Sequence, residues 1–488
     1  MSSLKTQGVK AYLWDFIGKI LQNGMGFIVS IFLARLLEPS EFGMIAMIMV
    51  IIGMAQIFTD IGLGGALIQR RRVLPIHYSS VFYFNIFIAS ILSLITYIFA
   101  SKIGEFYNNI ELVPLAEVMS LSFIIAAFSS VQNVKLRKEL NYALLTKMNL
   151  IASLISGILG VSLAFYGAGV WSLVVQNLSQ RVIYNILIWN RAKWKPSLEF
   201  SFKALMQLWG YGFRMFLSGL LENIFIRLDY LIIGKLFEAT ALGFFQRAKS
   251  LNLFVIRYSS SSLMSVLFPI LSKIQNDLPR FQNIIVKSLG IISFASFLLL
   301  GGLYLVSEEF IVLLFGEKWL PSVYYFKILV LSGYAYPISA LLVNVLSSRG
   351  NSKAFLRLEI YKKLISTVGF IILYFYNINT YLYTLIILVV LAVTLNIIFV
   401  SREINLPFFK LAKPILTQAG TAIISVMATT FIVQNIELTN IIMFIIKGSI
   451  FLFFYIGVNY LFKTSSFFYI LEQIKPVVKK KFVNKIDN

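Results

Sequence analysis

The sequence predicts an all-α polytopic membrane protein with about fourteen transmembrane helices, arranged as two parallel six-helix lobes and a C-terminal helix pair. Three observations support this fold class. Of the 488 residues, 58% are hydrophobic and only 13% are charged, and the mean hydropathy is +0.82. Apolar runs of about 20 residues, each long enough to span a bilayer, recur along the whole chain. A motif near the start of the chain also returns near its middle.

The repeated motif occupies residues 35–43 (RLLEPSEFG) and residues 235–243 (KLFEATALG), at a constant offset of 243 − 43 = 200 residues. A chance likeness between two leucine-rich segments is the alternative. The helix before each copy favours a true repeat, because each carries one polar stripe at helical spacing. Six predicted spans precede residue 204, where the helix before the second copy begins, so both copies enter the membrane in the same direction.

The fourteen predicted spans follow the apolar runs. They are residues 11–37, 42–69, 78–100, 113–132, 146–166, 168–190, 204–234, 241–272, 284–307, 324–346, 358–378, 380–400, 413–434 and 439–462. A charged, proline-containing linker breaks the apolar pattern after the sixth span. The predicted parts are an N-terminal lobe (1–190, spans 1–6), a cytoplasmic linker (191–203), a C-terminal lobe (204–400, spans 7–12), accessory spans 13 and 14 (401–463) and a basic cytoplasmic tail (464–488).

The loops between the spans alternate in charge. One set is basic, as at residues 70–72 (RRR), whereas the other set is short and acidic, as at Glu38 and Glu41. Because loops rich in lysine and arginine stay in the cytoplasm, both termini are predicted to be cytoplasmic.

The composition argues against several function classes. The net charge of +22 would suit a nucleic-acid partner in a soluble protein, but here it reflects basic cytoplasmic loops, so no nucleic acid is expected. No cysteine is present, which excludes thiolate metal sites and a catalytic thiol. The lone histidine, His77, falls in a basic loop and is expected at the surface. We therefore expect no catalytic residue, metal or cofactor, and a protein that is not an enzyme.

Ionisable residues inside the spans are the main functional signal. Each costs at least about 2.5–3.5 kcal/mol near the bilayer centre, so such groups face a bundle interior or a water-filled cavity. With the polar residues of the same helix faces, the candidates are Asp15, Lys19, Asp60, Tyr211, Arg214, Glu222, Asp229, Arg247 and Arg257. We interpret them as lining a hydrated, partly cationic cavity between the lobes.

Structural alternatives remain open for these charges. Paired charges can lock helices, as Asp15 with Lys19 one turn apart, or Arg214 with Glu222 across two turns. Lys19 also lies close enough to a helix end for its long side chain to reach the membrane surface.

Six stretches of the sequence, taken in order, resemble a known family. They are residues 32–43, 59–69, 229–234, 242–248, 268–273 and 314–319. Together they are similar to the polysaccharide-exporter branch of the multidrug/oligosaccharidyl-lipid/polysaccharide flippase superfamily, the Wzx-type proteins, and within it the WzxC-like group. The resemblance extends from about residue 10 to about residue 360, and the rest is generic apolar helix.

The resemblance implies a flippase of the bacterial inner (cytoplasmic) membrane. Such a protein moves polyprenyl-diphosphate-linked saccharide to the periplasmic leaflet, by alternating access of two lobes around a cationic cavity. The product would be O-antigen, capsule or exopolysaccharide. Implied partners are the lipid-linked saccharide, the bilayer, a coupling proton or sodium ion, and a polysaccharide polymerase.

The resemblance also implies roles for the candidate residues. Arg214, Arg247 and Arg257 are candidates for the diphosphate, because a planar guanidinium grips phosphate oxygens in pairs. Lys19 and Tyr211 are further cavity residues, and Tyr211 stacks on sugar rings unless it only packs in the core.

Ion coupling needs a carboxylate that can exchange a proton beside a cation. Glu222 is the first candidate because it shares a stripe with Arg214, and Asp60, Asp15 and Asp229 are the others.

Three other functions stay open. A flippase for a lipid-linked peptidoglycan precursor would share the mechanism. A multidrug exporter of the same superfamily would need a cavity dominated by acidic groups rather than arginines. An integral-membrane glycosyltransferase or polymerase would need a sizeable extracytoplasmic loop, and the acidic loops here are short.

Overall fold

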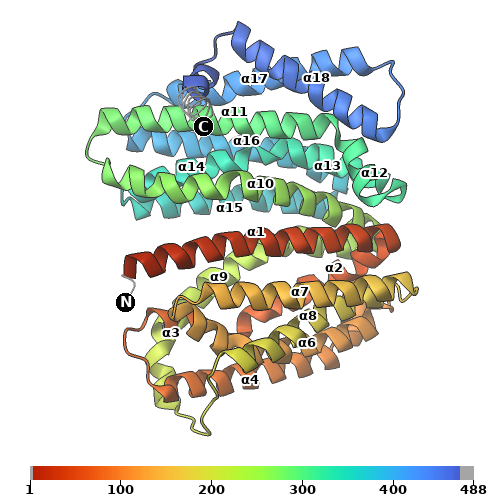
Figure 1. The fold of residues 1–488 in the computed structure, drawn as a ribbon, viewed down its shortest axis with the longest axis vertical. Coiled ribbons are helices and arrows are strands. Elements are labelled where there is room, and N and C mark those ends of the chain that lie inside the picture. Colours follow the sequence, from red (N-terminus) through yellow and green to blue (C-terminus); the bar gives the residue numbers. More distant parts are fainter. Residues whose placement is uncertain (1–3, 473–488) are drawn as a thin grey trace, which may run out of the picture. The chain divides into compact units, whose positions relative to one another are not determined.

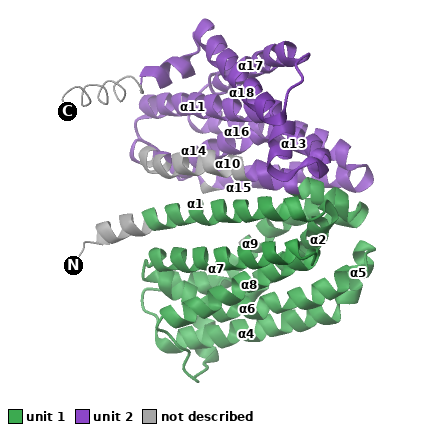
Figure 2. Cartoon of the chain, turned by 45° about the vertical axis from the view of Figure 1, so that its right-hand side comes forward, with its two compact units in different colours: residues 1–246 green, residues 247–488 purple. Residues whose placement is uncertain are grey.

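The structure is a computed structural model that describes residues 4–472, with the side chains of residues 4–12, 218, 254–266, 268–270, 272 and 352 outside the description. Within the described residues all regular secondary structure is helical, as the sequence predicts (Figure 1). Contacts divide the chain into two compact units, unit 1 (residues 1–246) and unit 2 (residues 247–488) (Figure 2).

Unit 1 contains the first half of the chain and the first two turns of α10. Its helices are α1 (Leu4–Leu36), α2 (Pro39–Ala55), η1 (Gln56–Thr59), α3 (Leu63–Gln69), α4 (Pro75–Ile98), α5 (Ala100–Tyr107), α6 (Leu112–Lys138), α7 (Tyr142–Phe165), α8 (Val170–Arg191), α9 (Phe202–Leu236) and the start of α10 (Ala239–Lys273). Among them, α1 packs on α7, α7 on α8, and α4 on α6. α9 packs on α2 and α3, so it belongs to unit 1 although its sequence opens the second copy of the repeat. The division into lobes at residues 191–203 remains a prediction.

Small residues let the helices of unit 1 approach closely. A methyl group at Gly18 of α1 would lie 2.2 Å from the Thr146 hydroxyl oxygen of α7. A methyl group at Gly157 of α7 would lie 2.4 Å from a methyl carbon of Val29 in α1. Lipid tails are as apolar as the side chains, so the hydrophobic effect does not hold membrane helices together. Close packing of this kind therefore stabilises the pair.

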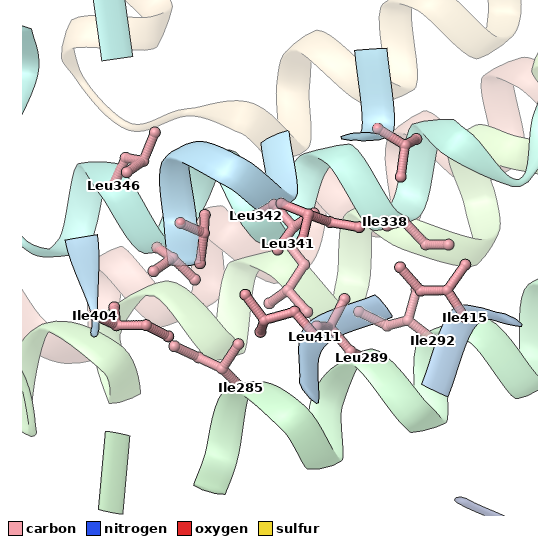
Figure 3. Packing of buried hydrophobic residues seen from close by; sticks show 14 of the residues in the cluster. Ile285, Leu289, Ile292, Ile338, Leu341, Leu342, Leu346, Ile404, Leu411 and Ile415 are labelled. Carbon is pink, nitrogen blue, oxygen red and sulfur yellow. The ribbon is translucent and has the colours of Figure 1, made fainter. Parts of the chain in front are cut away.

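Unit 2 is built around a large apolar core. Its helices are the rest of α10, α11 (Leu278–Leu305), α12 (Ser307–Phe315), η2 (Glu317–Trp319), α13 (Leu320–Gly333), α14 (Ala335–Ser348), α15 (Ser352–Phe375), α16 (Ile378–Glu403), α17 (Phe408–Val433) and α18 (Asn440–Leu461). Figure 3 shows Leu289 of α11, Leu341 and Leu342 of α14 and Leu411 of α17 converging on one another, and all four are fully buried. This cluster holds α11, α14 and α17 together.

Two of the predicted spans contain breaks. The span predicted at 42–69 divides into α2, η1 and α3, because Ile61 and Gly62 adopt positive φ angles of 43° and 74°. The span predicted at 324–346 divides into α13 and α14, where Pro337 removes one helix hydrogen bond.

Ten helical segments of the described chain are long and apolar enough to cross a membrane. The helices α8, α9 and α15 lie at predicted spans but are outside these ten, since they carry more polar and charged residues, and for much of α10 the side chains lie outside the description. The structure therefore confirms a helical protein with many potential spans, whereas the count of fourteen and the arrangement in two lobes remain proposals.

A buried polar network joins α17 to α18. The Tyr455 hydroxyl donates to the side-chain oxygen of Gln418 at 2.8 Å, and the Gln418 amide donates to the side-chain oxygen of Asn459 at 2.9 Å. Thr464, just after α18, donates to that same Asn459 oxygen at 2.7 Å. Because water is absent from the interior of a bilayer, these bonds supply the partners that buried amides require.

Candidate functional site

The two copies of the repeated motif meet in unit 1, where α2 and α10 begin. A methyl group on Gly43 would lie 1.7 Å from the Ala239 carbonyl oxygen, and one on Gly243 would lie 1.9 Å from the Pro39 carbonyl oxygen. The contact is reciprocal, because each glycine lies against the backbone of the other copy at the matching position. We call these four residues the glycine crossing. Any side chain at either glycine would push the two helices apart.

Local signals fix where these helices begin. Pro39 stands in the first turn of α2, where a helix needs no backbone donor, and the Glu41 carboxylate accepts the Glu38 N–H at 2.6 Å. In the second copy, α9 ends at Leu236 and α10 begins at Ala239. Each glycine therefore stands about one turn inside its helix.

A cavity of about 340 Å³ lies beside the glycine crossing, lined in part by Met47, Tyr107 and Lys235. The Lys235 ammonium donates to the Phe106 carbonyl and lies 4.9 Å from the centre of the Phe106 ring, which ties α9 to α5. Burial raises the pKa of the Tyr107 phenol, so this hydroxyl stays neutral.

Two partly buried arginines reach the second half of α2 and the start of η1. Arg227 of α9 donates to the Met49 carbonyl at 3.2 Å, and its guanidinium carbon would lie 2.2 Å from a methyl group on Gly53. Arg181 of α8 donates to the side-chain oxygen of Gln56 at 3.4 Å. Periodicity alone selects neither arginine as a site residue. The one sequence feature that could have indicated the Arg227 contact is Gly53, because a glycine inside an apolar helix leaves room for a side chain from a neighbouring helix.

The predicted charges of α1 satisfy each other. The Lys19 ammonium lies 2.5 Å from the Asp15 carboxylate, one helical turn away. The Lys19 side chain is 67% exposed, so the pair is not enclosed. For these two residues the structure contains the paired-charge alternative.

The predicted charges of α9 are arranged differently. Arg214 and Glu222 are both exposed, and no ion pair joins these two described side chains. Tyr211 is 36% exposed and approaches α3 at Gly65, where a methyl group would lie 4.0 Å from its ring. A fixed Arg214–Glu222 pair is therefore not observed, and the stripe presents a cation, a carboxylate and a phenol on one face.

The other two carboxylates make backbone contacts. Asp60 accepts the Gly64 N–H at 2.9 Å and so supports the first turn of α3, with the Asn85 amide 3.5 Å away. Asp229 is buried and accepts the N–H of Tyr230 at 2.9 Å. These backbone contacts orient both carboxylates.

Arg247, the first residue of unit 2, is buried against two aromatic rings. Its guanidinium carbon lies 4.8 Å from the ring centre of Phe315 and 5.1 Å from that of Trp319. Two stretches that carry the family resemblance, 242–248 and 314–319, therefore contact each other through this cation–π arrangement. The side chain of Arg257 lies outside the described residues.

His77 is buried rather than at the surface, which corrects the expectation from its loop position. It is 3% exposed, its Nδ1 accepts the Leu74 N–H at 3.2 Å, and its Nε2 lies 3.0 Å from the side-chain oxygen of Gln207. The reason is that the start of α9 covers the start of α4.

Unit 2 also contains a buried ion pair that sequence patterns do not reveal. Lys447 of α18 donates to the carboxylate of Glu309 in α12, and Glu309 is only 4% exposed. The partners are 138 residues apart, so no local spacing indicates the pair.

A family model described as "Polysaccharide biosynthesis protein" matches residues 32–324, more than half of the chain. The chain belongs to this family. The resemblance to polysaccharide exporters is thereby confirmed.

Several relatives in the family carry informative names. The chain is 24% identical to the lipopolysaccharide biosynthesis protein WzxC of Escherichia coli K12, over 65% of each chain. It is 28% identical to the teichuronic acid biosynthesis protein TuaB of Bacillus subtilis, over 57% of this chain and 58% of that protein. It is 24% identical to the succinoglycan biosynthesis transport protein ExoT of Rhizobium meliloti, over 67% of this chain and 64% of that protein. The chain thus spans less than two thirds of each of these relatives.

Solved structures support the fold. The lipid II flippase MurJ, in an inward closed conformation, is similar with a TM-score of 0.71 at 14% identity, over 92% of this chain and 99% of that one. An inward-facing multidrug transporter of the MATE family in the MOP superfamily has a TM-score of 0.60 at 16% identity, over 79% and 94%. At such identities the likeness concerns the fold alone.

Proposed function

We propose that this member of the polysaccharide biosynthesis family is a flippase for polyprenyl-diphosphate-linked oligosaccharide. It moves the head group from the cytoplasmic to the periplasmic leaflet for O-antigen, capsule or exopolysaccharide synthesis. Relatives named for lipopolysaccharide, teichuronic acid and succinoglycan support this substrate class. The physical need is clear, because a diphosphate and sugars lose several kcal/mol for each polar group left unsatisfied in hydrocarbon.

The glycine crossing carries the proposal. An alternating-access carrier needs a closure that forms between equivalent parts of its two repeats and can separate again. Backbone-to-backbone contact at Gly43 and Gly243 fits this need, because no side chains interlock across it. The crossing follows an acidic loop in both copies, so we assign it to the periplasmic end of the transport path.

The exposed stripe of α9 provides the head-group contacts in this proposal. Charged residues on a membrane helix face water rather than lipid, so Arg214 and Glu222 line a wet path, and Tyr211 lies on the same stripe. Arg214 binds the diphosphate, Tyr211 stacks on a sugar, and Glu222 exchanges a coupling proton or sodium ion. Arg247 and Arg257 are proposed as further phosphate contacts. A polysaccharide polymerase is the proposed partner that consumes the product.

Cross-linking tests whether the glycine crossing must separate during transport. Because the chain has no cysteine, the double variant Ser40→Cys/Thr240→Cys places its only thiols beside the crossing. Oxidation should stop flipping of lipid-linked oligosaccharide in vesicles, and reduction should restore it. The control is Ser93→Cys/Ser120→Cys, whose hydroxyls lie 3.4 Å apart between α4 and α6. The proposal fails if the oxidised Ser40→Cys/Thr240→Cys variant still flips lipid-linked oligosaccharide normally. It also fails if oxidation blocks the control variant as strongly.

The same vesicles separate the candidate substrates. Polyprenyl-diphosphate oligosaccharide should be flipped, whereas faster flipping of a lipid-linked peptidoglycan precursor, or efflux of a cationic drug, would favour the alternative functions.

Orientation can be read with single thiols. A cysteine at the exposed Glu308 should react with an impermeant reagent from the periplasmic side, and one at Lys195 should not. The opposite pattern would reverse the proposed topology. That topology places both termini of this inner-membrane protein in the cytoplasm.

A further inference from the structure

Unit 2 contains a basic cavity that the transport proposal does not use. Its volume is about 640 Å³, and it lies among α11, α17 and the segment after α18. Four lysines line it, and no acidic residue is among the described residues of its lining; the lysines are Lys287, Lys410, Lys413 and Lys463. All four are exposed, so their ammonium groups remain hydrated and accessible.

The cavity has a fixed wall. Thr464 contributes to the lining and is anchored from behind through Asn459, within the network that joins α17 to α18. A methyl group on Gly290 would lie 2.6 Å from the Ser466 hydroxyl oxygen, so this segment packs tightly on α11. The Lys287 ammonium lies 4.7 Å from the centre of the Tyr469 ring, so these two lining residues also join α11 to the segment after α18.

The other side of the cavity is apolar and open. Leu416, Ile424 and Phe462 line it, and they are 62%, 46% and 68% exposed. Leu416 and Ile424 belong to α17, which is apolar enough to cross a membrane and turns these side chains outward. Lysines and hydroxyls therefore stand next to an apolar surface suited to acyl chains.

We propose that this cavity binds the phosphate head group of an anionic membrane lipid. The lysines neutralise the phosphate, the hydroxyls of Thr417 and Ser465 are available as donors, and the acyl chains lie along α17. Basic pockets between membrane helices on the cytoplasmic side are suited to this chemistry. Inorganic phosphate would satisfy the same lysines but would leave the apolar side unused.

Lipid titration of the purified full-length protein in detergent, read by native mass spectrometry, tests the proposal. Cardiolipin should bind, and phosphatidylcholine should bind much more weakly. Lys413→Gln/Lys463→Gln should weaken cardiolipin binding roughly 30-fold, because each lysine near a lipid phosphate is worth about a factor of five. Lys273→Gln/Lys353→Gln removes two exposed lysines elsewhere in unit 2 and should change binding less than about twofold.

Further measurements keep the proposal open to contradiction. Lys413→Arg/Lys463→Arg keeps both charges and should bind like the parent protein, which separates lost charge from a damaged fold. Equal affinities in the Gln variant and the parent, or equal losses in the Gln variant and its control, would overturn the site. Displacement of cardiolipin by millimolar inorganic phosphate would reject the lipid as the ligand. Binding is measured without transport, so the result is independent of the flippase proposal.

Discussion

The two copies of the repeat agree at one place and differ at another. At the glycine crossing they are equivalent, with Gly43 and Gly243 each against the other copy's backbone. The helices that precede the crossing differ in how their charged side chains are arranged. On α1, Asp15 and Lys19 neutralise each other, whereas on α9 the exposed Arg214 has no ion pair with Glu222.

The equivalent and the differing parts of the two copies suit two different roles in transport. The equivalent part suits a closure, because opening and closing need a contact that both halves share. The part that differs suits recognition, because a cation already paired with a carboxylate, as Lys19 is, binds a phosphate less favourably than one without that pair. We therefore expect substitutions in α9 to affect transport far more than matching ones in α1.

The largest effect is expected at Arg214. Arg214→Ala should reduce surface-polysaccharide export about 100-fold, since a charge-assisted contact to phosphate is worth about 1.5–3 kcal/mol. Arg214→Lys should restore export only in part, because an ammonium cannot bind two phosphate oxygens in the same plane. Lys19→Ala on α1 is the matched control and should export normally. The measurement is surface polysaccharide per amount of protein in the membrane, and normal export by Arg214→Ala would contradict the assigned role.

A tenfold or somewhat larger effect is expected at the glycine crossing. Gly43→Ala and Gly243→Ala should reduce transport to a similar degree, because overpacking a tight contact costs about 1–3 kcal/mol. Gly24→Ala on α1 is the control, since nothing lies within 4 Å of a methyl group there. Flipping assays in vesicles would measure all three, and a large difference between the two crossing variants would break the equivalence of the copies.

A smaller and conditional effect is expected at Glu222. If one inward proton couples to each cycle, lowering the outside pH by one unit should speed transport by up to about tenfold, since a pH unit is worth about 1.4 kcal/mol per proton. Glu222→Gln keeps the shape of the side chain but cannot titrate, so this response should disappear. A retained response would exclude Glu222 and leave Asp60 to be tested in the same way.

The smallest effect is expected within the α1 pair. Asp15→Asn should change transport less than about twofold, because an exposed pair one turn apart contributes about 0.3–0.5 kcal/mol. A loss comparable to that of Arg214→Ala would mean that α1 takes part in recognition, and the contrast between the two helices would be wrong.

The fold class could be predicted from the sequence because membrane burial leaves a strong signal in hydropathy. The breaks could not be placed so well. At Ile61 the chain takes a positive φ angle that a β-branched residue rarely adopts, so the type of this residue does not predict the break. Pro337 does signal its break, since proline interrupts helix hydrogen bonding.

The site was predictable only where the partners are close in sequence. The spacing of Asp15 and Lys19 indicates their pair directly. Arg227 over Gly53, and Glu309 with Lys447, depend on which helices pack together, and periodicity along one helix carries no such information. His77 illustrates the same limit, because a loop position says nothing of the helix that covers it.

The polar network between α17 and α18 has a consequence for the synthesis of the protein. The translocon receives α17 first, and until α18 follows, the buried Gln418 has neither Tyr455 nor Asn459 as a partner. An unsatisfied amide in hydrocarbon is unfavourable, so we expect these two helices to enter the lipid together as a hairpin. A nascent chain stopped between them would expose that amide and become a substrate for membrane proteases.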